Sequence, residues 1–162
     1  MCNPQRSNKM ACIAFEQAKL SPCRYKHGSV ISKGSKVISK GFNNHRTKYS
    51  NSLCACTHAE IDVANKFIKT YMRKKNSFNK KNFNNFILWV VRLSNPNSNK
   101  LESKITGSKP CKECIKKLTK LGFCKVGYSD NNGNIIIENI KYMNNDHLSE
   151  AQLSFKKLEK SV

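Results

Sequence analysis

Four residues in two short segments of this sequence have the types and spacing of a metal site. One residue separates His58 from Glu60, and two residues separate Cys111 from Cys114. Cysteines three positions apart in the first turn of a helix project to the same side, so both sulfurs can reach one ion. Two thiolates and one imidazole leave the fourth tetrahedral position open, which is the arrangement of a catalytic zinc. The sequence therefore predicts Zn²⁺ held by His58, Cys111 and Cys114.

Glu60 is the candidate catalytic residue of this site. It is too close to His58 in the chain to be an independent ligand, but it can reach water on the metal. Zinc lowers the pKa of bound water, and a nearby carboxylate can take the proton and pass it on. Such a pair can replace an amino group on a ring carbon with oxygen.

Cys54 and Cys56 are separated by one residue, a spacing that is poor for two ligands of one tetrahedral ion and favours ordinary thiols. Two alternatives remain: one of these cysteines completes a structural zinc site, or they bind a second metal.

Each half of the metal motif is expected to begin a helix. Residues 58–71 have apolar residues at helical spacing, and the acidic Glu60 lies in the first turn, where the helix dipole favours it. Pro110 and Gly122 bracket a second helix. The continuous apolar run 86–93 indicates a strand that is covered on both faces.

The other segments complete an α/β pattern. Their periodicity predicts a helix at 9–20, a β-hairpin around Gly34, strands at 123–128 and 134–140, and a helix at 146–160. Only 130–133 separates the last two strands, and a parallel pair needs a far longer crossover, so these strands must be antiparallel. We expect a three-layer α/β/α sandwich with a mixed sheet of about five strands.

The length indicates one domain over residues 1–162. Its core is expected at about 10–140, followed by a tail at 141–162, with extended polar loops at 73–85 and 94–109. The sequence has no run of about 18 apolar residues and no long apolar segment near its start. These features predict a cytoplasmic protein that does not enter a membrane.

The charge of the chain is strongly positive, with 30 basic against 10 acidic residues and a net charge of +20. Such a field attracts polyanions, so DNA or RNA is a candidate partner. Codon bias is the competing explanation, because 25 lysines against 5 arginines and 20 asparagines are typical of an AT-rich genome. Codon bias does not, however, explain the small number of carboxylates.

Together, the two motifs form the H-x-E…P-C-x-x-C signature of zinc deaminases. Over about residues 10–140 the chain resembles the cytidine and deoxycytidylate deaminase superfamily, and Gly41-Phe42-Asn43 resembles the family's glycine-aromatic-asparagine motif after the second strand. The resemblance implies a zinc-dependent hydrolytic deaminase of a cytosine nucleoside or nucleotide, assembled as a homo-oligomer.

The resemblance also implies substrate contacts. Asn43 corresponds to an asparagine that contacts the sugar of the nucleoside, although a turn asparagine that caps the strand is the alternative. Ala59 corresponds to a residue whose backbone contacts the base. His45 and Arg46, with Lys48, are positioned in sequence to contact a substrate phosphate or to form an exposed basic loop.

Two features leave the substrate open. Cys111 follows His58 by 53 positions, more than in most members, and the excess lies in the two polar loops. Antiparallel final strands resemble the free-nucleoside branch, whereas the His-Ala-Glu motif resembles the deoxycytidylate and nucleic-acid branches. Two further functions are therefore retained: deamination of a base within DNA or RNA, and nucleic-acid binding or packaging on a deaminase fold.

Overall fold

A computed structural model describes residues 4–49, 52–53, 56–72, 80–94 and 104–160 of the chain. Its main strands are β1 (His27–Lys33), β2 (Lys36–Phe42), β5 (Phe86–Leu93), β7 (Lys125–Ser129) and β8 (Ile135–Asn139). Its α-helices are α1 (Pro4–Lys19), α2 (Ala59–Phe67), α3 (Lys112–Leu121) and α4 (Glu150–Lys160). Shorter elements are β3 (Lys48–Tyr49), β4 (Ser52–Leu53), β6 (Ile105–Thr106), a π-helical turn at Ile68–Met72 and 3₁₀ turns at Lys80–Asn85 and Ile140–Tyr142.

The sheet is mixed and has the strand order β2-β1-β5-β7-β8. Only β5 and β7 are parallel to each other, and the final pair β7–β8 is antiparallel, as the short connection predicts. The two-residue strand β6 pairs with the end of β5 and adds a sixth strand. This strand lies inside the region 94–109 that the sequence analysis treats as a loop.

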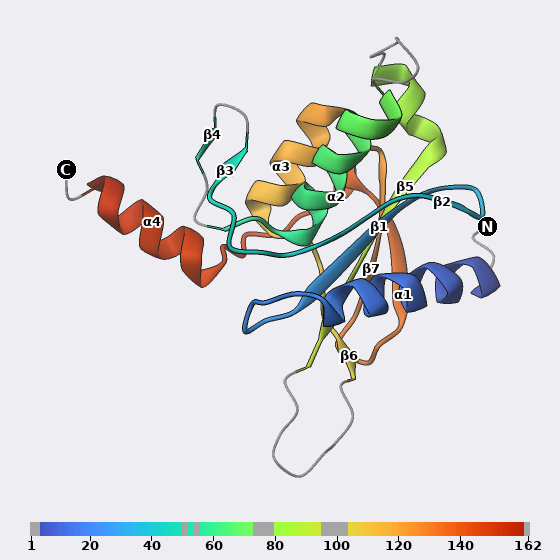
Figure 1. The fold of residues 1–162 in the computed structure, drawn as a ribbon, viewed down its shortest axis with the longest axis horizontal. Helices are drawn as coiled ribbons and strands as arrows, with labels where there is room; N and C mark the ends of the chain where they lie inside the picture. Colours follow the sequence, from blue (N-terminus) through green and yellow to red (C-terminus); the bar gives the residue numbers. More distant parts are fainter. Residues whose placement is uncertain (1–3, 50–51, 54–55, 73–79, 95–103, 161–162) are drawn as a thin grey trace.

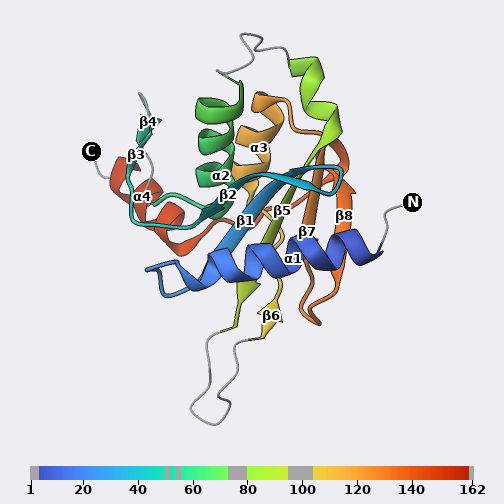
Figure 2. The same cartoon turned by 45° about the vertical axis from the view of Figure 1, so that its right-hand side comes forward.

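Helices cover both faces of the sheet, which confirms the three-layer arrangement. Figures 1 and 2 show α2 and α3 side by side on one face and α1 on the other. The central strand β5 follows this division, because alternate side chains of a strand point to opposite faces. Leu88 and Val90 pack in the cluster beneath α2 and α3, whereas Trp89 and Val91 pack beneath α1.

Local sequence explains where several elements begin and end. The turn between β1 and β2 contains Gly34 at φ 58°, and α3 ends at Gly122 at φ 100°, both left-handed conformations that favour glycine. Helix α1 begins at Pro4, earlier than the predicted start at residue 9, and α4 begins at Glu150 rather than at 146. Among the described residues, no helix is both long and apolar enough to cross a membrane.

Two predicted loops are partly ordered as secondary structure. Residues 80–85 form a 3₁₀ turn whose Phe83 is fully buried, while 73–79 lie outside the described residues. In the second loop, the backbone N–H of Ser94 donates to Lys104 O at 2.7 Å, just before β6 returns along β5. Residues 95–103 lie outside the described part of the chain.

Candidate active site

Three side chains predicted as metal ligands converge between the starts of α2 and α3. The Nδ1 atom of His58 lies 3.5 Å from the Sγ atom of Cys111 and 3.3 Å from that of Cys114. All three donor atoms lie within 4.8 Å of one another. Tetrahedral zinc with bonds of about 2.1 Å to nitrogen and 2.3 Å to sulfur separates such donors by about 3.5 Å. The residues present therefore fit a zinc ion in both donor type and spacing.

The two helices present these donors because the ligands occupy their N-terminal ends. His58 is the N-cap residue of α2 and Cys111 is the N-cap residue of α3, and neither side chain caps its own helix. Both side chains are therefore free to face the space between the helices. The positive ends of two helix dipoles meet there, which favours thiolate over thiol.

Packing of α2 against β2 fixes the position of His58. A Cβ atom at Gly41 would lie 2.7 Å from Oδ2 of Asp62 and 2.8 Å from the backbone nitrogen of Val63, so glycine permits the close approach. The buried Asp62 carboxylate then accepts a hydrogen bond from the Phe42 N–H at 3.2 Å and forms an ion pair with Lys66 at 2.6 Å. These contacts hold the first turn of α2 over the end of β2.

The donor cluster is electrostatically coupled. Hydrogen bonding from Cys114, together with that from His58, lowers the pKa of the Cys111 thiol to about 3. Burial opposes charge on the imidazole, but hydrogen bonds to Cys111 and Cys56 raise the pKa of His58 to about 11. The same cluster and its burial raise the pKa of Cys114. Protons are thus shared among groups that a metal ion would hold in their deprotonated forms.

Glu60 lies beside this cluster and lines the same pocket. Its side chain is only 4% exposed, and burial raises the pKa of its carboxyl to about 7. A carboxyl group with a pKa close to neutrality can both accept and return a proton at physiological pH. This property suits the role that the sequence analysis gives to Glu60.

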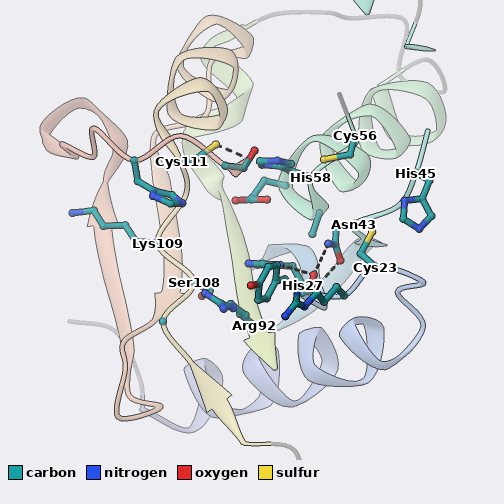
Figure 3. Close-up of a pocket in the computed structure, with 17 residues that line it drawn as sticks. Cys23, His27, Asn43, His45, Cys56, His58, Arg92, Ser108, Lys109 and Cys111 are labelled. Atoms are coloured by element: carbon teal, nitrogen blue, oxygen red, sulfur yellow. Dashed lines mark hydrogen bonds between the residues drawn. The ribbon is translucent and has the colours of Figure 1, made fainter. Parts of the chain in front are cut away.

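The pocket has a volume of about 560 Å³ and extends from the metal donors to the sheet. Figure 3 shows His58 and Cys111 at one end and Arg92, His27 and Ser108 at the other. We call these the metal end (His58, Glu60 and Cys111 of the lining, with Cys114 beside them) and the sheet end (Tyr25, His27, Arg92 and Ser108). A cavity of this size is in the usual range for a small-molecule site.

The structure brings most of the predicted substrate residues to this pocket. Asn43, His45 and Ala59 line it, whereas Arg46 is exposed and does not. The amide of Asn43 is already engaged: Oδ1 accepts from Ser21 Oγ at 2.6 Å and from the His27 N–H at 2.8 Å, and Nδ2 donates to Tyr25 O at 2.7 Å. The amide thus ties the end of β2 to the start of β1, as expected of a structural asparagine. The second N–H group of Nδ2 makes no hydrogen bond to the described residues.

Of the two cysteines before His58, the structure describes Cys56 and not Cys54. Cys56 lines the pocket and contacts His58, but it is not part of the group of metal donors. Cys54 lies outside the described residues. A metal site that uses Cys54 therefore stays a hypothesis.

Several pocket residues have no role in the sequence analysis. The sheet end, together with Lys109, comes from the loop before β1, the start of β1, the end of β5 and the loop before α3. The only sequence signal for this end is a charged residue, Arg92, inside the apolar run 86–93. The register of β5 with β1 places Arg92 opposite His27, and this register is not visible in the sequence.

The segment between β8 and α4 also reaches the pocket. His147 and Ser149 line it, and the Lys112 N–H donates to His147 O at 3.1 Å. From the first turns of α4, Gln152 Nε2 donates to the Cys111 sulfur at 3.6 Å, a contact of the kind that orients a metal ligand. The sequence predicts a tail at these residues, and no sequence signal indicates that the tail packs against the start of α3.

The sequence itself matches no protein-family model and no curated protein. Solved structures do match the fold. The dCMP deaminase of cyanophage S-TIM5 aligns with a TM-score of 0.54 and 18% identity over 80% of this chain and 86% of its own. Cytidine deaminase from Burkholderia pseudomallei aligns with a TM-score of 0.56 and 16% identity over 82% of this chain and 91% of its own. The chain therefore has the fold of the cytidine and deoxycytidylate deaminases, as the sequence resemblance predicts.

Proposed function

We propose that this protein is a zinc-dependent hydrolytic deaminase of a cytosine nucleoside or nucleotide. One observation carries the proposal: the His58, Cys111 and Cys114 donors meet at zinc-like spacing, and His58 and Cys111 line one pocket together with the buried carboxyl of Glu60. A purely structural zinc site would not need a buried carboxyl group beside its donors in the wall of a pocket. The cyanophage enzyme of the same fold has been solved with dCMP and dUMP, which supports a cytosine nucleotide as one substrate candidate.

His58, Cys111 and Cys114 would hold the metal in this proposal. When bound, zinc supplies a water of lowered pKa and a positive charge next to the reacting carbon. The three protein ligands leave one position for that water. Gln152 would orient the Cys111 thiolate through its long hydrogen bond.

Glu60 would move the protons. Its carboxylate takes one proton from the attacking water and delivers it to the ring nitrogen. It then takes the second proton of that water from the new hydroxyl on the ring carbon and delivers it to the amino group, which leaves as ammonia while the carbon–oxygen double bond forms. Burial of Glu60 keeps bulk water from competing for these protons. The carboxyl pKa of about 7 lets one group serve as base and then as acid.

Substrate positioning falls to residues at the wall of the pocket. We assign Ala59 to the base through its backbone in the first turn of α2, and Asn43 to the sugar through its remaining amide N–H. His45 lines the pocket and is available to the substrate, whereas the position of Arg46 outside the lining gives that residue no support.

Ammonia release by zinc-loaded protein tests the proposal. The substrates are cytidine, deoxycytidine, their monophosphates, adenosine, single-stranded DNA and RNA. We expect turnover of a small cytosine substrate, and a fall in kcat of at least about 10³-fold in Glu60→Gln, since proton transfer contributes about 10²–10⁴-fold. Glu113→Gln removes another carboxylate near the start of α3 and should retain activity. Absence of turnover with every substrate would contradict the proposal.

A second candidate is action on, or binding to, a polynucleotide. The net charge of +20 supports it, as do the exposed Lys116 and Lys120 along α3. A deaminase of polynucleotides would turn over cytosine in a single strand faster than free dCMP. A binding protein would instead bind the strand in a salt-sensitive way that survives Glu60→Gln.

A further inference from the structure

The sheet end of the pocket contains a cation without a counter-ion. Arg92 lines the pocket and is only partly exposed. Its Nε atom is buried and has no hydrogen-bond partner, and among the described residues no ion pair reaches its guanidinium. Its guanidinium lies over the Tyr25 ring, whose centroid is 4.9 Å from Cζ.

The position of Arg92 on β5 determines that its side chain reaches the pocket. Arg92 has the same parity on β5 as Leu88 and Val90, so its side chain leaves the sheet on the face covered by α2 and α3. Its neighbours in the sheet are His27 of β1 and Thr106 of β6. A charged side chain in the central strand is therefore held at the wall of the pocket.

Two other basic side chains of the pocket wall differ from Arg92. Arg24 also lies over the Tyr25 ring and has no ion pair with the described residues, but it is exposed to solvent. Lys109 lines the same pocket, but its Nζ lies 3.7 Å from the carboxylate of Glu138. Lys66 and Lys112 also have carboxylate partners. Burial of a charged donor without a partner is unfavourable, so a site that retains one is suited to a ligand that supplies the missing acceptor.

We propose that Arg92 binds the terminal phosphate of the substrate, so that the enzyme acts on a cytosine nucleoside 5′-monophosphate in preference to the free nucleoside. The inference rests on the proposed deaminase function and names its substrate class. A guanidinium offers parallel N–H groups that match two phosphate oxygens, and Arg92 lies in the wall of the pocket, where these groups can meet a ligand. The base then lies toward the metal end and the phosphate toward the sheet end, at opposite ends of one pocket.

A terminal phosphate fits this position better than a phosphate inside a strand. The guanidinium packs on the Tyr25 ring and is only partly exposed, at one end of the pocket. A terminal phosphate can fit at such an end of the pocket. An internal phosphodiester fits less well, because the nucleic-acid strand continues on both sides of it.

Two variants and one control test the assignment. Arg92→Met keeps the length of the side chain and removes the charge, Arg92→Lys keeps the charge and loses the fork, and Lys109→Met removes the neighbouring cation that is already paired. The first measurement is kcat/KM of the wild-type protein for dCMP and for deoxycytidine. The second is calorimetric binding of 2-deoxyribose 5-phosphate, inorganic phosphate and deoxyribose, none of which contains a base.

We expect the wild-type protein to prefer dCMP by about 100-fold or more, the scale of a charge-assisted bidentate contact. Arg92→Met should reduce that preference by most of this factor, chiefly through KM, with Arg92→Lys intermediate and Lys109→Met changing it by less than about 5-fold. 2-Deoxyribose 5-phosphate should bind the wild-type protein and bind Arg92→Met much more weakly. Circular dichroism and thermal unfolding establish that each variant is folded.

The outcomes separate this inference from the proposed function. Deamination of dCMP and deoxycytidine with equal kcat/KM by the wild-type protein would overturn the role of Arg92 and leave the deaminase standing. Absence of deamination, with Arg92-dependent binding of the sugar phosphate, would overturn the deaminase and keep the phosphate site. A single-stranded oligonucleotide that competes more strongly than dCMP, through Arg92, would overturn the assignment to a mononucleotide.

Discussion

The two ends of the pocket are built in different ways. The metal end is composed of residues in two short motifs, each at the start of a helix, so their geometry is largely local. The sheet end is composed of single residues from the loop before β1, the start of β1, the end of β5 and the loop before α3, brought together by strand register. The proposed metal donors thus come from short motifs, while the proposed phosphate site depends on how the strands of the sheet pair.

The largest effect should come from removing a donor at the metal end. Cys114→Ser replaces a buried sulfur of the proposed zinc site with a hydroxyl, which is a poor zinc ligand. Loss of a residue that only supports a ligand lowers metal affinity by about 10–100-fold, and we expect a larger fall here. Activity should disappear together with the metal. Zinc content by mass spectrometry and a competition titration measure the change.

Cys124→Ser is the matched control for that variant. Cys124 donates to Asn84 Oδ1 at 2.8 Å, away from the donor cluster, so its replacement should leave one zinc per chain. Retention of tightly bound zinc by Cys114→Ser would show that the metal end is not built from these three donors.

The support beneath the sheet end should be the next most sensitive region. A Cβ atom at Gly28 would collide with the carbonyl oxygen of Ala14 and the backbone nitrogen of Ala18, so Gly28→Ala must push α1 away from β1. We expect a loss of about 3 kcal/mol in the free energy of unfolding, at the upper end for overpacking. Urea unfolding followed by circular dichroism measures it.

Gly34→Ala provides the comparison for this substitution. Gly34 has φ 58° but open space around it, so only backbone strain of about 1 kcal/mol should result. If both variants lost the same stability, the close contact of α1 with β1 at Gly28 would not be the feature that supports the sheet end.

A smaller, pH-dependent effect is expected from His27 at the sheet end. Burial, with Arg92 nearby, lowers the pKa of His27 from 6.5 to about 4. The unfolded chain therefore binds more protons than the folded one between pH 6.5 and 4, and this contribution to stability is lost as the pH falls through that window. Because the ring is partly exposed, we expect a loss on the order of 1 kcal/mol between pH 7 and pH 5.

His27→Asn isolates the contribution of that residue. An asparagine amide can still donate to Tyr25 O in place of Nδ1, which lies 3.2 Å from it, but it does not titrate. The difference in urea midpoint between the two proteins should change from pH 7 to pH 5. A constant difference over this range would mean that His27 keeps its ordinary pKa in the folded protein.

Much of the fold could be predicted because its signals are local. The apolar run 86–93 matches β5 residue for residue, Gly122 ends α3, and the short 130–133 connection makes β7 and β8 antiparallel. The strand β6 was missed because two residues carry no periodicity, and its pairing with Arg92 and Leu93 is a long-range contact. The approach of Asn145, His147 and Gln152 to the start of α3 was missed for the same reason.

The sequence by itself determined the metal donors, the carboxylate beside them and the helices that begin with them, because each depends on spacings of a few residues. Only the tertiary structure decided what faces these groups across the pocket. Strand register places Arg92 beside His27, and the packing of α2 and α3 on that face turns an unpaired guanidinium toward the cavity. Register and packing depend on contacts between distant segments, and these contacts leave no periodic trace in the chain.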